Sequence, residues 1–219
     1  TVPFVDDGDA SFSISGTAAV GNTLSIKQYS SDPDTFVGNR VKEIFFNGSV
    51  FAGLKEDGSV VTWGSAESGG DSSSVSDELS SGVKEIHGVN GVFVALKEDG
   101  SVVTWGADER GDSSSVSNEL SSGVEKIFYN HGSFVALKED GSVVTWGYPH
   151  YGGDSSSVSD ELSSGVKEIF SNGWDTYVAL KDDGSVVTWG GSYNAGDSRT
   201  VSDELISGVK EIFSNGYGF

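Results

Sequence analysis

The sequence predicts an all-β protein built from repeated units, and three observations support this prediction. The motif Leu-Lys-(Glu/Asp)-Asp-Gly-Ser-Val-Val-Thr-Trp-Gly occurs four times, at residues 54–64, 96–106, 137–147 and 180–190. Its copies are 41 to 43 residues apart, which is the length that a propeller blade of four short strands needs. Gly is abundant, Pro is rare, and Val, Phe, Ile and Trp fill the apolar positions, a composition that favours strands over helices.

The boundaries of the repeat define the expected architecture. Complete units cover residues 41–82, 83–123, 124–165 and 166–208, and a partial fifth unit covers 209–219. We therefore expect a β-propeller of four-stranded blades with about four and a quarter repeats, which leaves the ring incomplete. A β-solenoid is the alternative, because its coils also stack apolar faces, although tight hairpins and long Ser/Gly loops are less natural in it.

Residues 1–40 precede the repeat and do not share its pattern. Polar and apolar residues alternate over 11–16 and 21–26, as they do in edge strands, so we expect a short β segment of two or three strands here. The stretch 16–24, followed by Asp-Pro-Asp at 32–34, resembles the start of the immunoglobulin-like repeats of giant bacterial surface proteins. Such a domain needs roughly 90–100 residues, so the segment is expected to be its first half or a strand-bearing linker.

Each unit is expected to contain three clear strands, for which the second unit serves as the example. These strands cover residues 83–86, 92–97 and 101–105. Glu-Asp-Gly at 98–100 joins the last two as a tight hairpin, because Gly supplies the positive φ that such a turn requires. The Gly/Ser-rich stretch 111–120 is expected to be a loop or a short fourth strand. The strands are apolar on both faces, and stacking of blades explains this pattern.

The order of residues within the repeat resembles that of a known family. Val-x-x-Ile is followed by aromatic-x-Ala-Leu-x-x-Asp-Gly-x-Val-x-x-Trp-Gly and a Gly-rich turn, and this order extends over residues 41–219. The pattern is similar to the repeat of the regulator of chromosome condensation family, whose members are usually seven-bladed propellers. The resemblance implies nucleotide exchange on a small GTPase, inhibition of secreted β-lactamases, or membership of the uncharacterised repeats of large bacterial exported proteins. The near-identity of the units, the acidity and the lack of Cys point to the exported group.

Charge and composition restrict the classes of partner. The formal charge of −20 argues against nucleic acid and anionic membrane surfaces, and it favours solubility, a cationic partner or calcium. The absence of Cys excludes disulfides and thiol chemistry, and no run of about 18 apolar residues would form a transmembrane helix. Because the sequence lacks an initiator Met, we expect a mature or excised part of a longer protein. The resemblance to the exported group implies a location outside the cell or at the bacterial cell surface.

Few residues qualify as site candidates, and none is expected to be catalytic. The three His fall at different places in their repeats, and the paired acids of the hairpins precede a Gly that marks a turn. Loop carboxylates could offer oxygen ligands to Ca²⁺, although their spacing matches neither an EF-hand loop nor the calcium-binding nonapeptide, and capping of the turn after Trp-Gly explains them better: Asp71, Asp112, Asp154 and Asp197. No other cofactor is expected.

Aromatic residues divide into a repeated set and a variable set. The tryptophans of the motif are expected to pack between blades, with each indole N–H donating to a carbonyl: Trp63, Trp105, Trp146 and Trp189. The variable aromatics lie where the repeats diverge and are the candidates for a recognition surface: Tyr148, Tyr151, Trp174 and Tyr193.

These observations lead to an expected function. We expect a non-enzymatic structural or adhesive repeat module of an exported bacterial surface or matrix protein. Its partners are expected to be a protein, a glycan or copies of itself, the last giving a homo-oligomer or a filament. The alternative is a dedicated protein-binding propeller of the inhibitor or nucleotide-exchange type, which would require a loop face that does not repeat.

Overall fold

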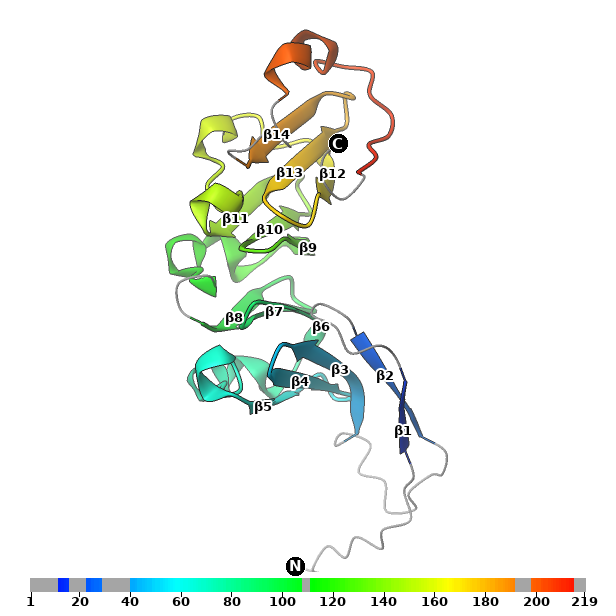
Figure 1. Cartoon of the computed structure of the whole chain (residues 1–219), viewed down its shortest axis with the longest axis vertical. Helices are drawn as coiled ribbons and strands as arrows, with labels where there is room; N and C mark the ends of the chain where they lie inside the picture. The colour runs from blue at the N-terminus through cyan, green and yellow to red at the C-terminus, as the bar shows by residue number, and fades with distance from the viewer. Residues whose placement is uncertain (1–11, 16–22, 29–39, 108–110, 192–197, 215–219) are drawn as a thin grey trace, which may run out of the picture.

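The described part of the chain forms four antiparallel sheets that follow one another in sequence order along a curved column (Figure 1). The computed structural model describes residues 12–15, 23–28, 40–107, 111–191 and 198–214. Within these residues, the sheets stack face to face as an open arc. The expected all-β class and the incomplete ring are therefore confirmed.

Each repeat unit forms a meander of three strands in which every strand pairs with the next along the chain. The strands of the four units are β3 (Val41–Asn47), β4 (Val50–Lys55) and β5 (Val60–Gly64); β6 (Val83–Val89), β7 (Val92–Lys97) and β8 (Val102–Gly106); β9 (Val124–Tyr129), β10 (Ser133–Lys138) and β11 (Val143–Gly147); and β12 (Val166–Ser171), β13 (Thr176–Lys181) and β14 (Val186–Gly190). Antiparallel pairing within each unit differs from the solenoid alternative, in which the strands of successive coils pair.

The hairpin between the second and third strands has the turn that the sequence predicts. In the first unit, Leu54 pairs with Val60, and Gly58 has a φ of 76°. Asp57 Oδ1 accepts hydrogen bonds from Ser59 N at 2.9 Å and Ser59 Oγ at 2.7 Å. Since the other three units make the same contacts, one local turn sets the register of every blade.

A β-bulge near the start of the first strand is common to all four units. In a regular strand, residues three apart point to opposite faces, but the extra residue of a bulge changes this alternation. In the second unit, Val83 and Ile86 consequently join the same core and are 4% and 2% exposed. The Val-x-x-Ile opening of the repeat thus places two apolar side chains against the preceding blade.

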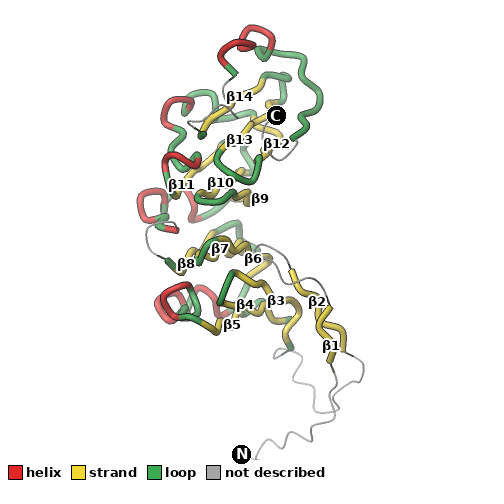
Figure 2. The backbone as a smooth tube through the Cα atoms, viewed as in Figure 1, coloured by secondary structure: helices red, strands yellow, loops and turns green. Residues whose placement is uncertain are grey.

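The Gly/Ser-rich stretch after the third strand forms 3-10 turns, which take the place of a fourth strand. These turns lie along one side of the column in the first three units (Figure 2). In the second unit they are η5 (Ser114–Val116) and η6 (Glu119–Ser121), and Leu120 is 2% exposed. In the first three units the stretch carries one buried Leu, Leu79, Leu120 or Leu162, rather than alternating apolar residues, so it packs through a turn instead of a strand.

Two strands precede the repeat and extend the first sheet. β1 (Phe12–Ser15) pairs with β2 (Thr23–Gln28), and β2 pairs with β3 in the register Thr23↔Phe45 and Ser25↔Glu43. The first sheet therefore has five strands in the order β1-β2-β3-β4-β5. Strand content was expected in this segment, and its pairing places it at the edge of the first blade.

The core lies between neighbouring blades, and the second and third sheets contribute both of their faces to it. Between the first two blades, Ala52 and Leu54 of β4 pack with Phe93 and Trp105 of the next unit, and all four are buried. The Trp105 Nε1–H donates to the carbonyl of Gly69 in the preceding unit at 3.1 Å. The Trp189 Nε1–H donates in the same way to the carbonyl of Gly152 at 3.1 Å, so the expected carbonyl partner is present for these two tryptophans. The expectation was wrong for Trp146, whose buried Nε1–H has no hydrogen-bond partner in the part of the chain that the structure describes.

No helix in the part of the chain that the structure describes has the length and hydropathy needed to cross a bilayer.

Candidate recognition site

Four ring-bearing side chains gather at one end of the third and fourth blades. They are His131 in the β9–β10 turn, Tyr148 and Tyr151 at η7 (Pro149–Tyr151), and Trp174 in the β12–β13 turn. The centroid of the His131 ring lies 5.8 Å from that of Trp174, with an interplanar angle of 29°, and 6.0 Å from that of Tyr151. The Tyr148 and Tyr151 centroids are 6.2 Å apart. We call these four residues the edge cluster.

Asn130 fixes the turn that carries His131. Its side chain is buried, and its Oδ1 accepts hydrogen bonds from the backbone N–H groups of Gly132 and Ser133, both at 3.0 Å. Its Nδ2 donates to the carbonyl of Tyr151 at 2.6 Å. One buried amide thus ties the β9–β10 turn to the segment that carries the two tyrosines.

The η7 turn is closed by local contacts that hold the tyrosines over β9–β10. Tyr148 N donates to the carbonyl of Gly132 at 2.9 Å, and Pro149 occupies the first position of the turn. A Cβ atom at Gly132 would lie 2.9 Å from Tyr151 Cδ2. A glycine is therefore required here, because the Tyr151 ring rests directly on its backbone.

Trp174 is presented by a second asparagine. Asn172 Oδ1 accepts hydrogen bonds from the backbone N–H groups of Trp174, Asp175 and Thr176 at 3.0–3.1 Å. The turn has one residue more than the corresponding turn of the third unit. The indole is 57% exposed, so a rigid turn displays a large apolar ring to solvent.

A polar contact beneath the edge cluster joins the third and fourth blades. The Tyr177 hydroxyl donates to the carbonyl of Ser133 at 2.9 Å, and Ser133 Oγ donates to the carbonyl of Tyr151 at 2.6 Å. Burial raises the pKa of Tyr177, so its hydroxyl remains a donor. The earlier blades carry Phe93 and Phe134 at this position, so this anchor belongs to the interface below the edge cluster.

The edge cluster includes three of the four residues that the sequence selected as recognition candidates. Tyr193, the fourth candidate, lies outside the described residues. The sequence did not select His131, which links Trp174 to Tyr151. Its position in the repeat could have indicated it. The turn after the first strand carries Gly48 in the first unit, Asn90 in the second and His131 in the third, so the residue at this position varies between units.

The calcium candidates lie in separate turns. Asp71, Asp112 and Asp154 each accept a hydrogen bond at 2.9 Å from a Ser backbone N–H two residues further on, and these bonds hold their pKa values below the usual range. Among the described residues, no three His, Cys, Asp or Glu side chains are grouped to hold a metal ion. Asp197 lies outside the described residues.

The remaining histidines are in different environments. His87 lies within the strand β6. Burial lowers the pKa of His87, and this effect outweighs the negative charge of Glu85, 3.8 Å away, which acts to raise it. His150 is exposed in η7.

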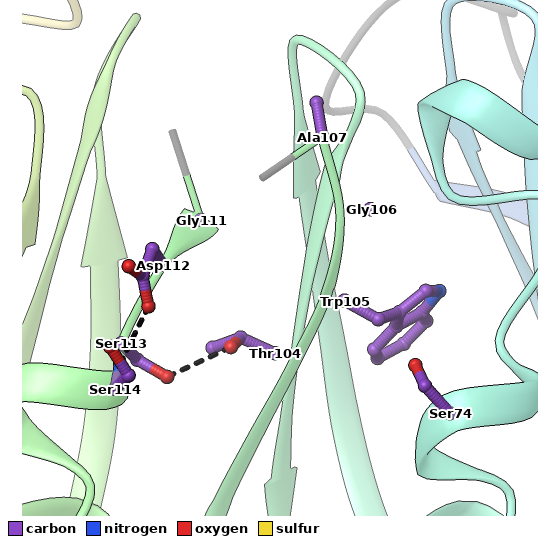
Figure 3. Close-up of a pocket in the computed structure, with 9 residues that line it drawn as sticks. All are labelled: Ser74, Thr104, Trp105, Gly106, Ala107, Gly111, Asp112, Ser113 and Ser114. Atoms are coloured by element: carbon purple, nitrogen blue, oxygen red, sulfur yellow. Dashed lines mark hydrogen bonds between the residues drawn. The ribbon is translucent and has the colours of Figure 1, made fainter. Parts of the chain in front are cut away.

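A cavity of about 450 Å³ lies beside β8 (Figure 3). Trp105 and Ser74 line it together with hydroxyls that are already paired: Thr104 Oγ1 lies 2.9 Å from Ser113 Oγ. The carboxylate of Asp112 accepts from Ser114 N on the same wall. Since these groups serve the local turns, the edge cluster is the stronger candidate for recognition.

Comparisons with known proteins concern the fold alone. No protein-family model and no curated protein matches the sequence. Among solved structures, the chain is similar to yeast RCC1 (Prp20) in complex with Kap60, with 17% identity, a TM-score of 0.48, and coverage of 87% of this chain and 53% of the other. The structure of Prp20p from Saccharomyces cerevisiae, whose title concerns binding to Gsp1p and histones, gives 18% identity, a TM-score of 0.45 and coverage of 68% and 44%.

A plant receptor ectodomain is also among the similar structures. The ectodomain of the receptor kinase CR4 from Physcomitrella patens gives 16% identity, a TM-score of 0.46, and coverage of 85% of this chain and 52% of the other. The chain spans about half the length of these structures.

Proposed function

We propose that the chain is a non-enzymatic adhesive module of an exported bacterial surface protein, in which stacked blades display the edge cluster to a protein partner with a basic surface. The observation that carries this proposal is the meeting of His131, Tyr148, Tyr151 and Trp174 from three separate segments. Extracellular location is part of the proposal, and the acidic charge and near-identical repeats support it.

The edge cluster has the properties of a protein-binding hot spot. Trp and Tyr are enriched in such sites because they bury a large area and lose little rotamer freedom on binding. Asn130 and Asn172 hold the turns beneath the rings, so binding requires little reordering of the backbone.

The charge of the chain selects a basic partner. With a formal charge of −20, the protein attracts cationic surfaces over long distances, and Arg or Lys side chains pack favourably on the faces of Trp and Tyr. A protein surface carrying Arg therefore fits this site better than a neutral glycan does.

The test uses hexaarginine as the probe and isothermal titration calorimetry as the measurement. We expect Trp174→Ala to weaken binding by about three- to thirtyfold, the value of a cation–π contact. Trp63→Ala is the matched control, because Trp63 is 41% exposed and lies in the first blade. Binding by the wild type should also weaken as salt is added.

Equal affinities of the wild type and Trp174→Ala would show that hexaarginine binds only to diffuse negative charge, and the proposal would then fail. Equal losses in the two tryptophan variants would have the same meaning.

A further inference from the structure

A histidine takes the place of a phenylalanine at one contact between blades. The residue after the Ile of the first strand is Phe45 in the first unit, His87 in the second and Phe128 in the third. Phe45 packs against the apolar cluster between the first and second blades, and Phe128 packs against the cluster between the third and fourth. The contact of β6 and β7 with β9 and β10, which we call the middle interface, therefore has a titratable ring where its two neighbours have an apolar one.

The His87 ring faces the third blade. Its residue pairs with Val94 across β6 and β7, and paired residues share a face of the sheet. Val94 is fully buried in the apolar cluster of the middle interface, and the centroid of the His87 ring lies 5.5 Å from that of Tyr129 on β9. The imidazole is 21% exposed, and its Nε2 is buried with no hydrogen-bond partner among the described residues. A neutral ring fits these surroundings, because an imidazolium would need acceptors for both of its N–H groups.

Glu85 acts on the charge of this histidine. It lies two residues before His87 on the same face of β6, with its Oε2 3.8 Å from His87 Nε2 and its side chain 38% exposed. Burial lowers the pKa of His87, and the charge of Glu85 raises it by less. The neutral ring is therefore the form that the folded middle interface favours.

The other strands of the middle interface bring little charge to the ring. On β9, burial raises the pKa of the Tyr129 hydroxyl, which therefore stays neutral. Glu125 and Lys126 pair with each other at 3.3 Å, and more than half of each side chain is exposed. Lys138 of β10 donates to a backbone carbonyl of the second unit at 2.8 Å, and β7 contributes apolar side chains. A proton on His87 would thus place a positive charge among mostly apolar groups.

The middle interface also lacks a hydrogen bond that its neighbours have. The Nε1–H groups of Trp105 and Trp189 donate to the carbonyls of Gly69 and Gly152 in the preceding units, both at 3.1 Å. Trp146 occupies the same position in the third unit, and its buried Nε1–H has no partner within the described ranges. Because an unpaired buried donor destabilises a contact, the interface that carries the histidine has less support than the two beside it at this position.

We infer that the middle interface is an acid-sensitive switch, in which a proton on the imidazole of His87 loosens the contact of the second blade with the third. The unfolded chain takes up this proton more readily than the folded chain does, because the folded state lowers the pKa of His87 from its usual value of 6.5. Stability is therefore lost as the pH falls from 6.5 towards the lower pKa of the folded state. Opening at this place separates the first two blades from the two that carry the edge cluster.

The first test is thermal denaturation, followed by circular dichroism at constant ionic strength. We expect the Tm of the wild type to fall by at least about 2 °C between about pH 7 and about pH 5. His87→Phe introduces the residue of the neighbouring interfaces and should abolish this fall, although His131 and His150 remain in the variant. Glu85→Gln should enlarge the fall, because it removes the charge that favours the imidazolium. A Tm that is constant over this range, or a fall that His87→Phe leaves unchanged, would overturn the inference.

A transferred histidine tests the position itself. Phe45→His in the His87→Phe background places the imidazole at the contact of the first and second blades, where Glu43 occupies the position of the neighbouring carboxylate. We expect the acid-dependent fall in Tm to return in this double variant. A fall that does not return, in a variant that circular dichroism shows to be folded, would contradict the role of this position.

Fluorine NMR of protein labelled with 5-fluorotryptophan locates the opening. Trp146 belongs to the cluster of the middle interface, whereas Trp105 and Trp189 belong to the clusters on either side of it. We expect the Trp146 resonance of the wild type to shift or broaden between about pH 7 and about pH 5, and His87→Phe should remove this response. Each resonance is assigned from its Trp→Phe variant.

A Trp146 resonance that does not respond to pH would overturn the switch, and so would equal responses of all three tryptophans, which would mean global unfolding. This titration of the wild type decides the matter even if the transferred histidine prevents folding. The inference is independent of the proposed function, because Trp174→Ala should leave both the Tm profile and the Trp146 response unchanged.

Discussion

At the scale of single residues, the polar side chains of this protein mainly serve the turns in which they lie. Asp57 and its counterparts bind the backbone two residues further on, and Asn130 and Asn172 bind the N–H groups of the turns that follow. The paired acids of the sequence are thus explained by turn geometry, as was expected. The same local contacts give the edge cluster its fixed form.

The hairpin aspartates predict an acid dependence of stability. Hydrogen bonds from Ser59 hold the pKa of Asp57 below its usual value, and Asp99, Asp140 and Asp183 are held in the same way. A depressed pKa contributes stability above the unfolded value of about 3.9, and that contribution is lost as the pH falls through the folded value. We therefore expect the Tm to fall below about pH 4.

Changing these four aspartates to Asn should reduce the Tm at neutral pH and flatten its fall in acid, because the amide oxygen accepts the same hydrogen bonds without titrating. The matched control changes the neighbouring acids, Glu56, Glu98 and Glu139 to Gln and Asp182 to Asn. This control removes the same charge. Identical pH profiles of the two variants would contradict the explanation, and thermal denaturation followed by circular dichroism measures both.

At the scale of elements, one turn connects each blade to the next. Gly58 in the β4–β5 hairpin has a positive φ, and its carbonyl accepts a hydrogen bond from Val83 N of the second unit at 2.9 Å. A Cβ atom here would lie 2.8 Å from the backbone N of Gly82. The hairpin is therefore part of the contact between successive units.

Gly58→Ala should consequently destabilise the protein more than the same substitution at a turn glycine that has no such backbone contact. We expect a loss of more than about 2 kcal/mol in the free energy of unfolding, the sum of the left-handed conformation and the backbone clash. Gly48→Ala is the control, since Gly48 also has a positive φ but nothing within 4 Å of its Cβ position, and about 1 kcal/mol is expected there. Urea denaturation compares them, and equal losses would rule out the clash.

The strands could be predicted from the sequence more accurately than the bulges and the contacts between turns. Residues 83–86, 92–97 and 101–105 correspond to β6, β7 and β8, because Asp-Gly and the apolar runs act locally. The bulge after Val83 did not follow, since it depends on which face meets the preceding blade. His131 was missed for a similar reason, because its neighbour Trp174 is brought to it only by the stacking of blades.

At the scale of the whole molecule, stability resides in the contacts between successive blades. The three buried clusters each join one blade to the next. Such a stack gains stability from each neighbouring pair, so equivalent residues differ in importance according to their place in the column.

The repeated tryptophan tests this arrangement with one substitution at two places. Trp105→Ala removes a buried ring and its hydrogen bond to Gly69, so we expect a loss of about 3–5 kcal/mol. Trp63→Ala acts on the outer face of the first blade, where Trp63 is 41% exposed, and should cost about 1 kcal/mol. Urea denaturation provides the comparison. Equal costs would mean that the two faces are equally covered in the monomer.

The reuse of one interface throughout the column has a consequence at the level of the gene. A blade inserted or deleted as a whole unit would bring together two faces that already fit each other elsewhere in the chain. Such a change would yield a longer or shorter array in which the apolar contacts between blades are preserved, whereas the hydrogen bond from Tyr177 to Ser133 is specific to the third and fourth blades. The length of the array is thus free to vary in steps of one unit, while the edge cluster depends on the particular pair of blades that carries it.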